Sequence, residues 1–248
     1  SGSFETGFTF TWAWENYADA FTDYREQLVR SILYAGLATV IALAISYPLA
    51  YWIAFRAGRW KNVFLVLVIA PFFVTYLIRT IAWQTILSDD GFVLDVLKTI
   101  GLVADDGRIL ATSTAVVLGI TYNYLPFMVL PIYVSLEQVD RSLVEAARDL
   151  YSNRAQAFLK VVLPLSLPGV LAAVLLTSIP AIGDYVNAAV LGNFAPGTSM
   201  IGNVIQAEFL RNRDYPEGAA LAFVLMAFMV VGAVIYARVL GTERITEG

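Results

Sequence analysis

Five long apolar stretches constrain this chain more than any other feature. A helix that crosses a hydrocarbon core of about 30 Å needs roughly 20 apolar residues, because it rises about 1.5 Å per residue. Stretches of that length lie at about 31–55, 63–87, 111–134, 161–186 and 219–240. The sequence therefore predicts an all-α integral membrane protein with a membrane domain over 31–240.

The third and fourth apolar stretches contain internal prolines, among them Pro126, Pro131 and Pro180. Proline is costly inside a soluble helix, but membrane bundles tolerate it because neighbouring helices satisfy the carbonyls that lose their partners. These prolines are therefore compatible with spans. Together with Gly183, Pro180 predicts a break near the outer end of the fourth stretch.

The composition argues against catalysis within this chain. Of the 248 residues, 58% are hydrophobic, only 15% are charged, and none is His or Cys. Without His or Cys, neither a disulfide framework nor a Cys/His metal site can form, and no glycine-rich phosphate loop or serine-nucleophile motif is present. The net charge of −4 argues against nucleic acid as a partner. We expect a transport subunit with no metal and no cofactor of its own.

Basic residues predict which side of each span faces the cytoplasm. One set of loops carries nine Lys and Arg residues, three of them in the compact loop 56–61, and the opposite set carries six. The first side is therefore predicted to be cytoplasmic. It holds the loop 137–160 and the C-terminal tail 241–248, and residues 1–30 lie outside.

An outer N-terminus requires the polar segment 1–30 to cross the membrane unaided. The chain also begins at Ser1 without an initiator Met. Both observations favour a sixth span ahead of the visible sequence over a genuine five-span protein.

The cytoplasmic loop 137–160 has the pattern of a short amphipathic helix. Leu143, Ala146, Ala147 and Leu150 recur at helical spacing. Either Asp140 or Ser142 can cap the first turn. Small alanines between leucine anchors suit docking on another protein. The alternative is a helix that lies on lipid headgroups.

Two separated blocks in this region decide between these alternatives. They are Glu145, Ala146, Ala147, Arg148, Asp149 and Leu150, followed by Leu-Pro-Leu-Ser-Leu-Pro-Gly-Val over 163–170. Both blocks, at this spacing, closely resemble the "EAA" signature of ABC importer permeases. The resemblance implies the six-span, type I (MetI-like) permease fold, with residues 145–151 coupling to an ATPase. Tyr151 departs from the family, which usually has Gly there, and Asn153 could adopt the left-handed conformation instead.

The resemblance also implies a set of partners in a bacterial inner membrane. They are a second permease subunit that completes the pore, a dimer of ATPase subunits that binds Mg-ATP, an external substrate-binding protein, and membrane lipid. The outer stretch 214–217 and the acidic N-terminal segment are candidates for docking the binding protein.

Further blocks narrow the kind of importer. They lie at 47–52, 71–73, 77–79, 125–131, 201–205 and 213–216. These blocks resemble the permeases for the polyamines spermidine and putrescine. Permeases for ferric iron, thiamine or phosphonate share the coupling segment, so another small solute is the alternative. A secondary transporter would need ion-coupling residues within a self-sufficient chain, and the buried charges here are few. A membrane anchor without transport would need no coupling helix.

A polyamine crossing hydrocarbon needs carboxylates for its ammonium groups and aromatic faces for cation–π contact. Asp184 is the acid within the predicted spans, and we expect it to contact a substrate ammonium or to pair with Arg79. The predicted path is completed by the polar and aromatic residues Trp83, Tyr122, Asn123, Tyr124 and Tyr185. Each aromatic could instead belong to packing or to the interfacial belt, and Asn123 could bond a neighbouring helix.

Overall fold

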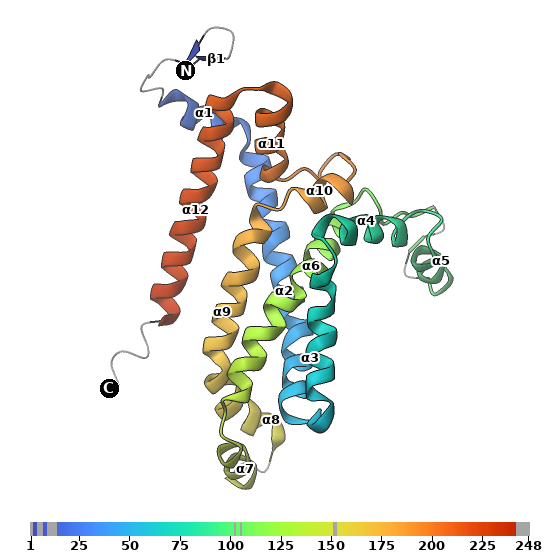
Figure 1. Cartoon of the computed structure of the whole chain (residues 1–248), viewed down its shortest axis with the longest axis vertical. Helices are drawn as coiled ribbons and strands as arrows, with labels where there is room; N and C mark the ends of the chain where they lie inside the picture. The colour runs from blue at the N-terminus through green and yellow to red at the C-terminus, as the bar shows by residue number, and fades with distance from the viewer. Residues whose placement is uncertain are drawn as a thin grey trace. The chain divides into compact units, whose positions relative to one another are not determined.

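The computed structural model describes residues 2–3, 7–8, 14–101, 103–104, 106–150 and 153–241, and these are predominantly helical (Figure 1). A two-residue antiparallel pair, β1 (Gly2–Ser3) with β2 (Gly7–Phe8), precedes the helices. The α-helices are α1 Glu15–Asp23, α2 Arg25–Phe55, α3 Lys61–Ile69, α4 Tyr76–Ile86, α5 Phe92–Thr99, α6 Ser113–Glu137, α7 Arg141–Leu150, α8 Arg154–Ala157, α9 Leu163–Ile182, α10 Val186–Val190, α11 Ile201–Ala207 and α12 Tyr215–Gly241.

Among the described residues, four helices are long and apolar enough to cross a membrane. They are α2, α6, α12 and the continuous helical segment Ala155–Ile182, whose main part is α9. Each of them corresponds to an apolar stretch of the sequence. The helix α2 begins at Arg25 and α12 at Tyr215, several residues before the hydropathy boundaries.

The second apolar stretch, 63–87, is not one continuous helix. It consists of α3, a 3₁₀ turn Ala70–Phe73, and α4, and the two helical parts meet at an angle of 95°. Pro71 has no N–H to continue the helical ladder, and Val74 is extended, with φ −104° and ψ 135°. The described part of the chain therefore contains a fifth span only if this bent pair crosses as one.

The fourth span ends earlier than the predicted 161–186. The helix α9 stops at Ile182, and a turn through Gly183 and Asp184 leads into α10. The predicted break is thus present, but Pro180 lies within the helix and the break follows Ile182. Asp184 consequently lies beyond the helix rather than inside it.

The chain divides into two compact units. One comprises residues 1–37, 80–120 and 179–248, and the other comprises 38–79 and 121–178. In the second unit, an apolar core gathers Ile53 of α2 with Met128, Ile132 and Leu136 of α6. The described residues of the first unit include two smaller apolar clusters. One gathers α1, α11 and α12 around Leu221, and the other gathers buried residues between α4 and α10.

Within the second unit, α6 and α9 approach closely at Gly169. A Cβ built at Gly169 would lie 2.6 Å from the carbonyl oxygen of Pro131 and would overlap Ser135. The Ser135 hydroxyl also donates to the Ser166 carbonyl at 3.3 Å. Gly169 therefore allows the fourth span to pack against the third directly beside the loop 137–160.

We predict that Gly169→Ala destabilises the protein by about 1–3 kcal/mol, because a tight helix contact must open. The thermal midpoint of the purified protein should fall by about 2–10 °C. Gly36→Ala is the matched control, because nothing lies within 4 Å of a Cβ there. Equal midpoints for the two variants would show that the α6–α9 contact does not require glycine.

Candidate coupling segment and translocation path

The helix α7 is capped by Asp140. The Asp140 carboxylate accepts a hydrogen bond from the Ser142 backbone N–H at 2.8 Å, and its carbonyl accepts from Leu143 N at 3.1 Å. Of the two predicted caps, Asp140 is therefore the residue used. The bond from Ser142 holds the pKa of Asp140 below its ordinary value, so this cap is fully formed at neutral pH and is lost only as the pH falls through that lowered value.

The helix α7 turns one side chain inward and several outward. Val144 is buried in the core of the second unit, whereas Leu143, Glu145 and Ala146 are exposed. Leu143 and Ala146 belong to the predicted apolar stripe, so part of that stripe faces away from this chain. The side chains of Ala147, Arg148, Asp149 and Leu150 lie outside the described part of the structure, as does all of Tyr151.

The second half of the loop is anchored by Phe158. Its ring meets Tyr47 and Tyr51 of α2 edge-on, with centroid distances of 5.7 Å in both cases. The Tyr47 hydroxyl in turn lies 2.7 Å from the Ser166 hydroxyl of α9. Sequence reasoning missed this anchor, although the i, i+4 spacing of two tyrosines on one helix face was a signal for it.

Asn153 does not take up the left-handed turn that the sequence suggested. Its side-chain oxygen accepts a hydrogen bond from the Ala155 backbone N–H at 2.9 Å and so caps the start of α8. Asn153 is not among the described residues with positive φ. The loop therefore consists of two capped helices, α7 and α8, followed by a π-helical turn, Phe158–Val162, that leads into α9.

Removing the cap tests how far α7 depends on it. We predict that Asp140→Ala raises hydrogen exchange of the first-turn amides of α7 about threefold or more, because a helix N-terminus loses its acceptor. Asp140→Asn should behave like the parent, since Asn is an equally good cap. Exchange measured by mass spectrometry on both variants decides this, and equal protection in Asp140→Ala would contradict it.

In the other unit, Asp184 lies in the turn between α9 and α10. Its two carboxylate oxygens accept from the backbone N–H of Asn187 at 3.1 Å and from the Asn187 side-chain amide at 2.8 Å. Asp184 is 6% exposed and Asn187 is fully buried. The carboxylate therefore has a structural contact that the sequence did not reveal: it organises the first turn of α10.

Neighbouring elements hold this turn in place. A Cβ at Gly119 of α6 would lie 2.7 Å from the Asn187 side-chain oxygen, so α10 packs tightly on α6 there. The Asn203 side chain of α11 donates to the Tyr185 carbonyl at 3.0 Å. The Tyr185 ring itself is 43% exposed, which leaves it accessible beside a buried acid.

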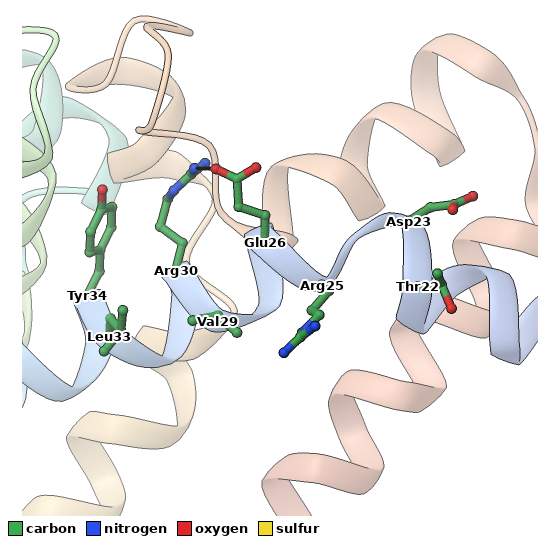
Figure 2. A pocket seen from close by; sticks show the side chains of 8 residues that line it. All are labelled: Thr22, Asp23, Arg25, Glu26, Val29, Arg30, Leu33 and Tyr34. Carbon is green, nitrogen blue, oxygen red and sulfur yellow. Dashed lines mark hydrogen bonds and ion pairs between the residues drawn. The ribbon is translucent and has the colours of Figure 1, made fainter.

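The loop before α11 is tied to the N-terminal part of α2, whose Glu26, Arg30 and Tyr34 side chains are drawn in Figure 2. Arg30 donates to the Ser199 carbonyl at 3.0 Å, and Tyr34 donates to the Gly197 carbonyl at 2.5 Å. Arg30 also pairs with Glu26, one turn earlier. These residues border an open hollow of about 590 Å³, lined by Thr22, Asp23, Arg25, Glu26, Val29, Arg30, Leu33 and Tyr34.

The remaining predicted path residues occupy different environments. Trp83 packs against the apolar cluster of the first unit. In the second unit, Asn123 is buried, and Tyr122 borders an apolar cavity of about 180 Å³ between α2, α3 and α6. The Tyr124 ring lies 6.3 Å from the Tyr76 ring. The predicted pairing of Asp184 with Arg79 stays a prediction.

The two acidic segments that the sequence predicts to lie outside come together within the first unit. The helix α1 lies across the start of α12 (Figure 1), and a cavity of about 220 Å³ between them is lined by Asn16, Asp19, Asp23, Asp214 and Glu217. Behind it, buried Glu208 accepts from the Tyr24 hydroxyl at 3.2 Å. Burial and then the charges of Glu208 and Glu217 raise the pKa of Tyr24, so its hydroxyl remains a donor.

Helices long and apolar enough to span a bilayer, with an exposed amphipathic helix between the third and fourth apolar stretches, define an integral membrane protein. The chain matches the family described as "binding-protein-dependent transport system inner membrane component" over residues 46–241, and it belongs to that family. It is thus an inner-membrane permease component of such a system.

Similarity to individual permeases extends over most of the chain. It is 38% identical over 225 residues to "Spermidine/putrescine transport system permease protein PotB" of Haemophilus influenzae, covering 90% of this chain and 78% of that protein. The PotB of Escherichia coli is 37% identical, over 87% of this chain and 78% of the relative. A "probable molybdenum ABC transporter permease protein" of Haloferax volcanii is 30% identical, over 86% of this chain and 74% of that protein.

Solved structures share the fold. A subunit of a bacterial ABC transporter for import of alginate superimposes with a TM-score of 0.77 at 16% identity, covering 94% of this chain and 84% of that one. A subunit of a bacterial alginate ABC transporter in complex with an alginate-bound periplasmic protein superimposes with a TM-score of 0.72. The predicted all-α ABC importer permease fold is thereby confirmed.

Proposed function

We propose that this chain is the permease subunit of an ATP-driven polyamine importer, with spermidine or putrescine as cargo. The observation that carries the proposal is the 37–38% identity to two PotB permeases over most of both chains. The outer cavity lined by Asp19, Asp23, Asp214 and Glu217 supports it, because a field of carboxylates attracts a polycation.

In this proposal α7 couples the permease to an ATPase subunit. Leu143 and Ala146 present an apolar patch that nothing in the described part of the chain covers, and Val144 fixes α7 to the core. On the opposite side of the loop, Phe158 ties the same segment to α2. A force applied to α7 would therefore reach α2 and α9 through packed aromatic and hydroxyl contacts.

The full importer would contain two permease subunits, an ATPase dimer and an external binding protein. Mg-ATP would bind in the ATPase subunits, and the present chain would carry no cofactor and no catalytic residue. The basic loops place α7 and the C-terminus on the cytoplasmic side. ATP-driven closure of the dimer would then open the permease outward to receive polyamine.

Within the path, we assign Asp184 to a substrate ammonium, with Tyr185 beside it. Trp83, Tyr122, Asn123 and Tyr124 remain the proposed aromatic and polar lining. Engagement of Asp184 would compete with its bonds to Asn187, so substrate binding and the first turn of α10 would be linked.

The molybdenum permease relative marks the competing cargo, an oxyanion. The decisive measurement is ATPase activity of the reconstituted complex with binding proteins loaded with spermidine, putrescine or molybdate. We expect stimulation by the polyamine-loaded proteins alone. Stimulation by molybdate without stimulation by polyamines would overturn the assignment of cargo while leaving the importer class intact.

A further inference from the structure

Four aromatic rings form a cluster in the second unit, on both sides of the break in the second apolar stretch. The centroids of Phe72 and Phe127 are 4.9 Å apart, those of Tyr76 and Tyr124 are 6.3 Å apart, and those of Tyr124 and Phe127 are 6.1 Å apart. Phe72 and Phe127 are more than a third exposed in the single chain, so one side of this aromatic cage is accessible.

A cation already lies against two of the four rings of the cage, Phe72 and Tyr76. The Arg79 guanidinium carbon lies 5.6 Å from the ring centroid of Phe72 and 5.6 Å from that of Tyr76. Arg79 is only 7% exposed, yet its Nε and Nη1 have no hydrogen-bond partner among the described residues. A buried guanidinium with unmet donors is costly, so its position depends substantially on the aromatic faces.

The occupancy of the cage depends on the bend. Phe72 belongs to the 3₁₀ turn before the break, whereas Tyr76 and Arg79 belong to α4 after it. The 95° angle between the two helical parts brings these groups together. A change in that angle would alter the approach of Arg79 to Phe72, because the break at Val74 lies between them.

We propose that this cage of Phe72, Tyr76, Tyr124 and Phe127 is a binding site for a primary ammonium group, and that Arg79 is its resident, displaceable cation. The identity of the ammonium as a polyamine rests on the proposed function. Arg79 in the cage would repel a polycation, and its departure as the bend changes would free the ring faces for substrate.

The surroundings favour an organic cation over an anion. The negative faces of aromatic rings attract ammonium and repel carboxylate or phosphate. The apolar cavity bordered by Tyr122 lies along the same helices, with Pro71 and Pro126 lining it directly before the cage residues Phe72 and Phe127. A methylene chain that follows an ammonium would find an apolar surface there.

Direct binding to the full importer complex in nanodiscs, without binding protein, tests this assignment. The probes are radiolabelled spermidine and n-butylammonium. Arg79→Gln should tighten the binding of both about threefold to tenfold, the range of a cation–π contact, because the internal competitor is gone. Arg79→Lys keeps a cation and should bind like the parent.

The double variant Arg79→Gln with Phe72→Leu should lose most of that gain, whereas Arg79→Gln with Phe228→Leu should keep it, because Phe228 is an exposed ring on α12. Thermal midpoints show whether each variant is folded. Unchanged or weaker ammonium binding in folded Arg79→Gln would overturn the proposal. Binding of an anionic probe such as butyrate to the parent, lost in Arg79→Gln, would also overturn it, because it would show that Arg79 serves an anion site. Tightened butylammonium binding without spermidine import would support the cage and contradict the polyamine cargo instead.

Discussion

Ala146→Arg is expected to abolish coupled transport while leaving the permease folded. Ala146 is exposed on α7, so the isolated chain can accommodate a long side chain. An arginine buried in an ATPase groove would lack a partner and cost several kcal/mol, and each 1.4 kcal/mol is a factor of ten. Uptake and ATPase stimulation by loaded binding protein should therefore fall by about 100-fold.

Gln138→Arg is the matched control for this variant. It introduces the same side chain at an exposed position of the same loop, in the turn before α7, and it should retain most uptake. Co-purification of the ATPase separates loss of docking from loss of signalling. Normal uptake by Ala146→Arg would place the ATPase contact elsewhere and would favour the alternative in which α7 lies on lipid.

Asp184→Asn is expected to lower uptake about 10- to 100-fold, because a charged hydrogen bond to an ammonium is worth about 1.5–3 kcal/mol. The structure adds a complication, since the carboxylate also accepts two bonds from Asn187. An amide at position 184 can keep both bonds only if the Asn187 side chain reverses. A loss of uptake alone would therefore not distinguish charge from structure.

Asn187→Ala provides the distinction. It removes the side-chain partner of Asp184 but keeps the carboxylate, so it should lower the thermal midpoint more than it lowers uptake. If Asp184 binds an ammonium, Asp184→Asn shows the opposite pattern, with low uptake and a midpoint near that of the parent. Parallel losses of uptake and midpoint in both variants would indicate that Asp184 only organises α10.

Local sequence patterns predicted the helices because their causes are local. The helical spacing of Leu143 and Ala146 predicted the helix α7, and Asp140, just before its first residue, predicted the cap. The bend within the second apolar stretch was not anticipated, because hydropathy does not report the backbone angles at Val74. Pro71 was a signal for the break, but prolines in α6 and α9 break nothing, so proline alone could not place it.

The long-range contacts of the site could not be predicted in the same way. Phe158 meets Tyr47 and Tyr51 from more than a hundred residues away, and nothing near Phe158 in the sequence indicates those partners. The same holds at position 169, where glycine is required because Pro131 and Ser135 of a different helix leave no room for a Cβ. Such contacts depend on helix packing, which periodicity does not specify.

The apolar stretches by themselves determined that the chain is a membrane protein, because about 20 apolar residues are what a bilayer requires of a helix. The blocks at 145–150 and 163–170 determined its family, since they are local in sequence. Only the tertiary structure decided that Asp184 is buried, with its partner Asn187 packed against α6, and that Arg79 lies against two aromatic rings across a bend. The environment of a buried charge is set by side chains that the fold brings to it, and the bend at Val74 brings Phe72 to Arg79.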